Sequence, residues 1–233
     1  MSKISVIVPL LNEEKVLPLF LDHLRKLPVN EVICVDGGSH DRTTDILLKW
    51  AEGDSAECRR VVISSSKGRA LQMNEGAKGA IGEILFFLHA DSWVDADGPR
   101  AILNALKDDL LVGGAFRLKI NSPGVFLKGV AFAVNARSRY LSLPYGDQGY
   151  FVRRNIFETL GGFKNLPLME DVDFIGRLQK EGPIVLLNES ITTSARRWEQ
   201  RGRFYTTLRN LVLVILYFLG IAPEKLAQWY YNK

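Results

Sequence analysis

Residues 85–94 read LFFLHADSWV, and this stretch decides how the rest of the chain is interpreted. The apolar residues before His89 form the pattern of a strand buried on both faces of a sheet. Side chains two positions apart in an extended segment project from the same face, so we expect His89 and Asp91 to face a common place. The stretch therefore predicts a buried strand that ends in a polar pair able to hold a ligand.

Strands and helices alternate on both sides of this stretch. Apolar runs predict strands over residues 4–9, 31–36, 60–64 and 83–88. Apolar residues at helical spacing predict helices over 13–27 and 68–80, and a third helix with Ser39 as its N-cap. Strict alternation is typical of an α/β fold with a parallel sheet covered by helices on both faces.

The second half of the chain is less regular. We expect strands over 112–120, 149–153 and 183–187, and a helix over 171–181. No linker or repeat interrupts the sequence. We therefore predict one main domain over residues 1–200, followed by a C-terminal helical extension over 201–233.

Charge and composition limit the kinds of ligand and partner that the protein can bind. The 233 residues carry a formal net charge of +4, and the positive charge gathers in places such as 196–203. This distribution suits an anionic ligand or membrane surface, whereas no continuous basic stripe indicates nucleic acid. Cys34 and Cys58 are the only cysteines, which excludes a disulfide framework, and Cys34 is expected in the core. The chain enters a strand at once without a leader pattern, so we predict a cytoplasmic protein.

Polar clusters follow each predicted strand of the first half, at 12–14, 36–39, 67–69 and 89–91. The carboxyl ends of parallel strands share one edge of a sheet, where α/β proteins bind ligands. Asp36 before two glycines suits ribose or base hydrogen bonds, or else caps a turn. Lys67 to Arg69 open a helix and suit a phosphate, or form a solvated basic turn. The clusters therefore predict one site.

Carboxylates supply the remaining chemistry. Asp91 suits Mg²⁺ or Mn²⁺, whereas His89 either joins it or is satisfied by a backbone carbonyl. Glu170, Asp171 and Asp173 crowd the start of a helix, where one carboxylate complements the helix dipole and another is a candidate general base.

Five pieces of the sequence together resemble family 2 glycosyltransferases of the GT-A fold. In order along the chain they are VPLLNEE (8–14), VDGGSHDRT (35–43), KGRALQMNEGA (67–77), LHADS (88–92) and LMEDVDFIGRL (168–178). The resemblance implies a Rossmann-like, mostly parallel mixed sheet with helices on both faces. It also implies a nucleotide-diphospho-sugar donor, a divalent cation (Mn²⁺ or Mg²⁺), and transfer to an acceptor hydroxyl with inversion at the anomeric carbon.

The resemblance also implies roles for single residues. Asp171 would deprotonate the acceptor with Glu170 beside it, and Asp91 would hold the metal. His89 stands where the family usually has Asp. The expected donor-binding residues are Pro9, Leu10, Asn12, Glu13, Asp36, Gly68, Arg69, Gln72, His89, Ala90 and Asp91.

A narrower resemblance covers GDQGYFVRR (146–154) and SARRWEQRGRFYTTLRN (194–210). These stretches are similar to a bacterial subgroup of small family 2 enzymes, some of them assigned to arsenosugar biosynthesis. Asp147 and Gln148 are expected to line the acceptor pocket. Arg196, Arg197 and Trp198 are expected to clamp the diphosphate and the sugar, or else to form an ordinary basic segment with a core tryptophan.

Residues 211–219 read LVLVILYFL, which is too short for a spanning helix. A helix that is apolar all round must be covered, and we expect it to pack on the domain. The alternatives are a homodimer interface or a peripheral anchor at the inner face of the membrane. For function, the alternatives to glycosyl transfer are a nucleotidyltransferase and a catalytically silent nucleotide- or glycan-binding module.

Overall fold

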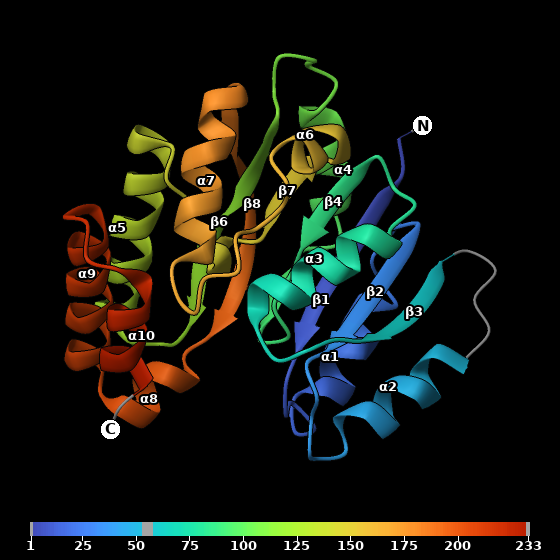
Figure 1. Ribbon diagram of the computed structural model, residues 1–233, viewed down its shortest axis with the longest axis horizontal. Coiled ribbons are helices and arrows are strands. Elements are labelled where there is room, and N and C mark those ends of the chain that lie inside the picture. The colour runs from blue at the N-terminus through green and yellow to red at the C-terminus, as the bar shows by residue number, and fades with distance from the viewer. Residues whose placement is uncertain (1, 53–57, 232–233) are drawn as a thin grey trace.

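The computed structural model describes residues 2–52 and 58–231, which form one eight-stranded sheet between two layers of helices (Figure 1). The sheet has the strand order β3-β2-β1-β4-β7-β6-β8-β5. Its strands are β1 (Ile4–Leu10), β2 (Glu31–Asp36), β3 (Arg59–Ser64), β4 (Ile84–Phe87), β5 (Ser92–Val94), β6 (Gly113–Asn121), β7 (Tyr150–Arg153) and β8 (Ile184–Ser194).

Strands β1 to β4 are parallel, whereas β7 lies antiparallel between β4 and β6. Strands β6 and β8 are again parallel, and the short β5 runs antiparallel to β8. The predicted mostly parallel mixed sheet of the GT-A fold is therefore confirmed. Strand β8 runs to Ser194, beyond the predicted end at 187, because it pairs with β6 along nearly its whole length.

Helices cover both faces of the sheet. Along the chain they are α1 (Leu17–Leu24), α2 (Thr43–Glu52), α3 (Arg69–Gly79), α4 (Gly98–Ala105), α5 (Val125–Leu141), the 3₁₀ turn η1 (Gly146–Gln148), α6 (Arg154–Thr159), α7 (Glu170–Glu181), α8 (Arg196–Arg201), α9 (Arg203–Phe218) and α10 (Pro223–Tyr231). One core lies between the sheet and α1, α2, α4 and α5, and the other between the sheet and α3, α6 and α7. Cys34 is buried in the first core, as predicted.

Two predicted helix starts are wrong. The predicted helix over 13–27 is the shorter α1, with Pro18 in its first turn, and Ser39 does not cap α2. Instead, the Ser39 hydroxyl donates to Asp36, and α2 begins only at Thr43, whose N–H donates to the Asp41 carboxylate at 3.0 Å. The Ser39 hydroxyl accepts the Asn12 N–H at 2.9 Å, and Ser39 lies four residues before the first residue of α2.

The C-terminal helices pack beside the start of α7. Leu213 of α9 and Leu226 of α10 form a third cluster with Met169 and Val172. The apolar run 211–219 nevertheless turns a broad face to solvent, so its predicted burial against the domain is wrong for that face. The last two residues of the predicted extension lie outside the described residues.

The strand order places a switch point between β1 and β4. The chain first winds from β1 outward to β3 and then returns to add β4 on the other side of β1. Loops that leave the carboxyl ends of two such strands diverge, and the crevice between them is the usual ligand site of an open α/β sheet.

Candidate active site

Two cavities meet at this switch point. The large cavity, of about 810 Å³, lies at the ends of β1 and β4 and beside the start of α3. The small cavity, of about 190 Å³, lies between the starts of α7 and α8 and one side of α9. Both are lined by the same six residues, here called the shared wall: Arg69, His89, Asp91, Leu168, Glu170 and Arg197.

The large cavity collects most of the predicted donor-binding residues. Its lining includes Pro9, Leu10, Glu13, Gly68, Arg69, Gln72, His89, Ala90 and Asp91. These residues come from the polar clusters that follow β1, β3 and β4. The predicted convergence of strand ends on one site is therefore confirmed for these three clusters.

Asn12 and Asp36 do not line this cavity. The Asn12 side chain accepts a hydrogen bond from the His40 N–H at 2.8 Å. The buried Asp36 carboxylate accepts from the N–H groups of Gly38 and Ser39 and from the Thr44 hydroxyl. The structure thus uses Asp36 to close the turn after β2, and its donor-binding role stays a prediction.

Gln72 joins the ends of β1 and β2 beneath the large cavity. Its Nε2 donates to the carbonyl oxygens of Leu10 at 2.7 Å and Val35 at 2.8 Å. A Cβ at Gly37 would lie 2.9 Å from the Gln72 amide carbon, so a side chain there would push this amide aside. Gln72 therefore fixes the cavity floor and exposes only part of its amide to a ligand.

The shared wall carries the predicted pair His89 and Asp91. The His89 ring hydrogen-bonds to the backbone of Gly146. Burial and the nearby Arg69 guanidinium hold the pKa of His89 well below its usual range. His89 is therefore a neutral imidazole anchored to the backbone, while Asp91 faces both cavities.

Arg69 and Glu170 form an ion pair within the shared wall, at 2.9 Å. Burial raises the pKa of Glu170, and Arg69 opposes that rise. Although burial alone would lower it, the carboxylates of Glu170 and Asp171 raise the pKa of Arg69. Glu170 is thus committed to Arg69, which leaves Asp171 as the carboxylate free to serve as a base.

Asp171 lines the small cavity from the first turn of α7. Its Oδ2 accepts the Gly146 N–H at 2.8 Å, and its Oδ1 accepts the Val172 N–H at 2.8 Å. Two backbone donors fix the carboxylate in one orientation, and each oxygen keeps a lone pair for a further donor. A base held in this way can receive a proton from a hydroxyl that enters the cavity.

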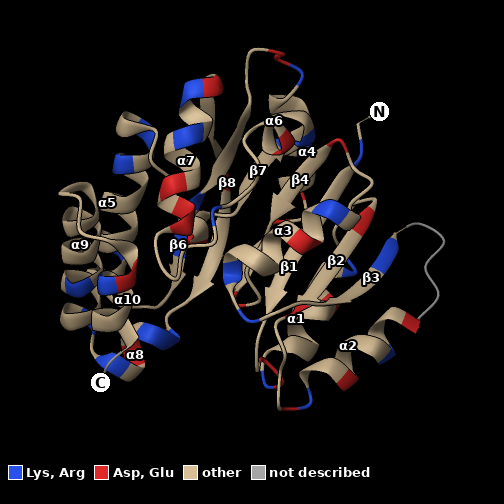
Figure 2. Ribbon diagram, viewed as in Figure 1, with Lys and Arg blue, Asp and Glu red and all other residues tan. Residues whose placement is uncertain are grey.

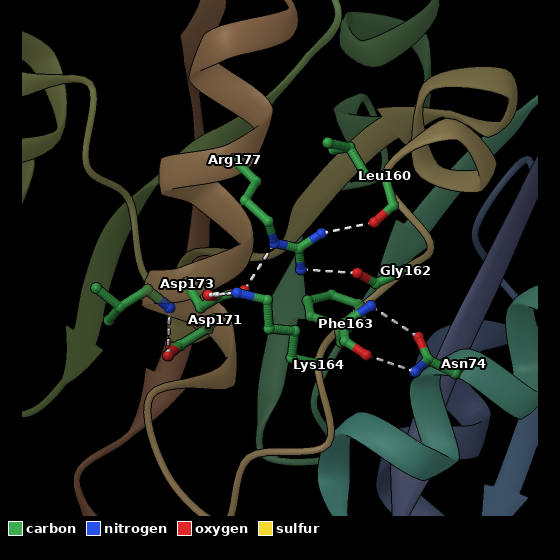
Figure 3. Close-up of polar contacts among 9 residues, drawn as sticks. Asn74, Leu160, Gly162, Phe163, Lys164, Asp171, Asp173 and Arg177 are labelled. Atoms are coloured by element: carbon green, nitrogen blue, oxygen red, sulfur yellow. Dashed lines mark hydrogen bonds and ion pairs between the residues drawn. The ribbon is translucent and has the colours of Figure 1, made fainter. Parts of the chain in front are cut away.

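Asp173, in the first turn of α7, is held in two side-chain ion pairs and lines neither cavity. Figure 3 shows its ion pairs with Lys164 at 2.8 Å and Arg177 at 2.7 Å. Arg177 also donates to the carbonyl oxygens of Leu160 and Gly162. These contacts fasten the segment before α7 to the helix that carries Asp171.

The same segment is fastened to α3. The Asn74 side chain donates to the Phe163 carbonyl oxygen at 2.8 Å and accepts its N–H at 2.9 Å (Figure 3). Residues 165–168 then continue into the large cavity, and Met169 takes a left-handed backbone conformation with φ of 67° directly before α7. The turn places Glu170 and Asp171 against the shared wall.

The predicted acceptor and diphosphate residues separate in the structure. Asp147 and Trp198 line the small cavity, and Arg197 lines both cavities. Gln148 is fully buried, donates to the Phe116 carbonyl oxygen at 3.1 Å and accepts the Ser138 hydroxyl at 2.7 Å. The structure therefore does not bring Gln148 to the cavity, because the 3₁₀ turn points it into the core.

The Arg196 guanidinium forms an ion pair with Glu13 at 3.4 Å. Arg196 lines neither cavity, and this contact joins α8 to the loop after β1. Burial raises the pKa of Glu13, and Arg196 counteracts that rise. The orientation of the Trp198 indole is fixed by its Nε1, which donates to the Thr207 hydroxyl at 3.1 Å.

Several lining residues were not found from the sequence. The C-terminal helix supplies Tyr230 to the small cavity and Tyr231 to the large one, and α9 supplies Thr206, Asn210, Leu213 and Val214. Thr206 and Asn210 lie in the quoted stretch 194–210 but were not singled out in it, and no motif marks the other four residues. Residues 165–168, by contrast, adjoin the acidic cluster, and that proximity could have indicated them.

The side chains of the shared wall fit a divalent cation that has few protein ligands and is held mainly by the phosphate oxygens of a bound nucleotide. In the described part of the chain no group of three His, Cys, Asp or Glu side chains could form a metal centre. A magnesium- or manganese-type ion commonly binds one or two carboxylates and completes its shell with phosphate oxygens and water. Asp91, open to both cavities, fits that arrangement, whereas the His89 ring is held by Gly146.

Comparison with known proteins finds a matching family model and several similar enzymes. Residues 5–161 match the model for "Glycosyl transferase family 2". An undecaprenyl-phosphate 4-deoxy-4-formamido-L-arabinose transferase of Photorhabdus laumondii is 26% identical, over 97% of this chain and 70% of that protein. A PGL/p-HBAD biosynthesis glycosyltransferase of Mycobacterium bovis is 31% identical, over 73% of this chain and 67% of that protein.

Solved structures agree on the fold. The mannosyltransferase PcManGT of Pyrobaculum calidifontis, in complex with GDP-Man and Mn²⁺, superposes with a TM-score of 0.71 at 17% identity, covering 99% of this chain and 70% of that one. Residues 1–349 of S. aureus TarS in complex with UDP give 0.65 at 22% identity, covering 91% and 64%. The narrower resemblance to the arsenosugar subgroup stays a prediction.

Proposed function

Because the chain belongs to glycosyl transferase family 2, we propose that it moves a sugar from a nucleotide-diphospho-sugar to an acceptor hydroxyl, with inversion and with the help of a divalent cation. The observation that carries the proposal is the shared wall. A donor in the large cavity and an acceptor in the small cavity meet across it, and Asp171 stands on the acceptor side.

Residues of the large cavity bind the nucleotide-diphospho-sugar. Lys67 and Arg69 at the start of α3 suit the diphosphate, which also meets the positive end of that helix. The structural neighbours were solved with GDP-Man and with UDP, so the donor class rests on their shared chemistry, a nucleoside diphosphate. When bound at Asp91, a divalent cation would supply positive charge to that diphosphate.

Transfer needs a base on the acceptor side and cations on the donor side. Asp171 takes the proton of the acceptor hydroxyl, whose oxygen then bonds to the anomeric carbon. The bond from that carbon to the diphosphate oxygen breaks, and the electron pair leaves with the nucleoside diphosphate. Attack from the small cavity and departure into the large one lie on opposite sides of the sugar, which produces inversion. Arg69 and Arg197, on the shared wall, stabilise the departing charge.

The environment of Asp147 favours an acceptor substrate that carries more than one hydroxyl group. Its Oδ1 is buried in the wall of the small cavity and has no hydrogen-bond partner among the described residues. An unpartnered buried acceptor costs about 1–3 kcal/mol, which a donated hydroxyl hydrogen bond would recover. Burial raises the pKa of Asp147 to about 6, so near neutral pH the carboxylate is available to accept.

A thermal-shift screen tests the donor half of the proposal. Nucleoside diphosphates should raise the melting temperature, because a ligand that binds only the folded chain stabilises it by mass action. The shift should grow when Mn²⁺ or Mg²⁺ is added, and Asp91→Asn should remove that increment while the metal-independent part remains. A metal increment that is unchanged in Asp91→Asn would contradict the assignment of Asp91.

Product analysis tests the reaction type. Turnover should release nucleoside diphosphate and give a product of opposite anomeric configuration, which NMR of the glycoside reports. Release of pyrophosphate would instead indicate a nucleotidyltransferase. The absence of nucleic acid among the partners stays a proposal that rests on the charge distribution, and the cytoplasmic location stays a prediction.

A further inference from the structure

Helix α9 exposes an apolar face along its whole length. Phe204, Leu208, Leu211, Val212, Ile215 and Phe218 follow one another at spacings of one, three or four residues and are between 42% and 76% exposed. Side chains spaced in this way share one side of a helix. A helix of 16 residues is about 24 Å long. These side chains, here called the α9 face, therefore form a continuous apolar surface rather than isolated exposed residues.

The opposite side of α9 belongs to the proposed transfer site. Thr206, Asn210, Leu213 and Val214 line the small cavity, and Leu213 packs on Met169 and Val172 next to Asp171. Helix α9 therefore separates the acceptor cavity from whatever contacts its outer face. An object docked on the α9 face would lie one helix diameter from the acceptor cavity.

The surroundings of the α9 face are basic. No Asp or Glu occurs between Glu199 and Glu224, and this segment carries the exposed Arg201 at the end of α8 and the exposed Arg203 at the start of α9. Helix α5 lies beside α9, with the rings of Phe126 and Phe204 4.5 Å apart. Figure 2 shows Lys and Arg but no Asp or Glu on these two helices.

Helix α5 extends the same chemistry. It has no acidic residue, its Lys128 and Arg139 are exposed, and so are its Phe132 and Tyr140. A cationic groove of about 620 Å³ between α5 and β6 is lined by Arg117, Lys119, Lys128 and Arg139. Apolar side chains framed by cations match the two components of an anionic lipid surface.

We propose that the α9 face docks on an anionic lipid bilayer. Within residues 2–52 and 58–231 no helix is long and apolar enough to cross a membrane, so α9 would lie in the interfacial plane. A second copy is a less suitable occupant, because its α9 segment contains no Asp or Glu that could pair with these arginines, whereas an anionic headgroup can. Docking does not depend on the proposed function, but it would hold the acceptor cavity close to the lipid surface.

Vesicle sedimentation with the full chain tests the proposal. We expect binding to phosphatidylglycerol-containing vesicles, much weaker binding to pure phosphatidylcholine, and weakening by added salt, because screening reduces the attraction to anionic headgroups. The double variant Leu208→Glu/Ile215→Glu should lower the apparent affinity at least about tenfold, since it places two carboxylates in the apolar face.

Matched variants separate the face from general surface hydrophobicity. Leu48→Glu/Leu110→Glu changes two equally exposed leucines far from α9 and should leave vesicle binding unchanged. Arg201→Glu/Arg203→Glu should weaken binding to the anionic vesicles. Circular dichroism and the thermal shift with nucleoside diphosphate should match wild type in every variant, and if the double α9 variant does not fold, Leu211→Gln should give a smaller loss of the same kind.

Three results would overturn the proposal. They are a wild-type protein that sediments with neither vesicle, an α9 double variant that binds as wild type does, and loss of binding in the control pair to the same extent. A dimer in sedimentation velocity that the α9 variants convert to monomers, without vesicle binding by wild type, would assign the face to a second copy. Failed transfer with intact vesicle binding would count against the proposed function alone.

Discussion

The guanidinium of Arg69 and the carboxylate of Glu170, 101 positions apart in the chain, meet at 2.9 Å in the wall between the two cavities. The pair ties the start of α3 to the start of α7. Since α3 supplies groups to the large cavity and α7 supplies Asp171 to the small one, the pair sets the distance between the two halves of the proposed reaction.

Breaking this pair should destabilise the fold unequally. Arg69→Met leaves a carboxylate that is only 4% exposed without its cation, whereas Glu170→Gln leaves an arginine that is 37% exposed and can be solvated. We expect Arg69→Met to lower the free energy of unfolding by about 1–3 kcal/mol, less than for fully buried pairs because water screens Arg69, and Glu170→Gln to cost less. Urea denaturation measures both, and equal costs would contradict the asymmetry.

Asp171→Asn should abolish transfer while donor binding survives. The amide cannot take up the acceptor proton, and removal of a general base typically slows a reaction about 100- to 10,000-fold. The thermal shift with nucleoside diphosphate should stay close to that of wild type, because Asp171 lines the small cavity and not the large one.

Asp173→Asn is the matched control for this variant. It changes a carboxylate two positions away that is paired with Lys164 and Arg177 rather than open to a cavity. We expect it to lower the melting temperature and to leave kcat within a few-fold of wild type. Equal, negligible turnover in wild type and Asp171→Asn would favour the silent binding module instead.

Gly146→Ala should impair catalysis more than stability. A Cβ at Gly146 would lie 3.1 Å from both the Asp171 Oδ2 and the His89 Nε2, so both side chains must move by a few tenths of an ångström. A displaced base misses the near-attack geometry, and we expect kcat to fall about tenfold or more with little change in donor affinity.

Gly129→Ala provides the comparison for this substitution. Gly129 lies within α5, and a Cβ there meets nothing within 4 Å. Alanine has the higher helix propensity, so the variant should gain up to about 1 kcal/mol of stability with unchanged kcat. A Gly146→Ala enzyme as active as Gly129→Ala would show that the contact of Gly146 with Asp171 does not position the base.

Asp147 predicts a pH-dependent loss of stability. Burial raises the pKa of Asp147 from 3.8 to about 6, so the folded chain keeps a proton that the unfolded chain has already lost. Its contribution is therefore fully present below about pH 4 and is lost as the pH rises through 6. Between pH 4 and 7, wild type should lose about 1–3 kcal/mol relative to Asp147→Asn, as measured by urea denaturation at each pH. Parallel pH curves for the two proteins would contradict this assignment.

The sequence by itself determined that Pro9, Arg69 and Asp91 would share one site. Parallel strands carry their carboxyl ends to the same edge of a sheet, so residues that follow such strands converge whatever the details of packing. It also determined the position of Glu170 and Asp171 at the start of a helix, because the apolar period of α7 begins directly after them. The alternation of strand and helix patterns in the first half of the chain was likewise sufficient to predict the sheet and the helical layers on its two faces.

Only the tertiary structure decided which polar residues were left for ligands. Gln148 looks as available in the sequence as Asp147, but its amide lies in the core, where it accepts the Ser138 hydroxyl and donates to the Phe116 carbonyl oxygen, and these contacts depend on how the 3₁₀ turn packs on α5 and β6. Tyr230 and Tyr231 reach the cavities because α10 packs on the start of α7, a contact between segments about 60 positions apart that no local pattern encodes. The same holds for residues 211–219: this run is apolar on every side, and the neighbours it meets in the fold determine which side is buried and which remains exposed.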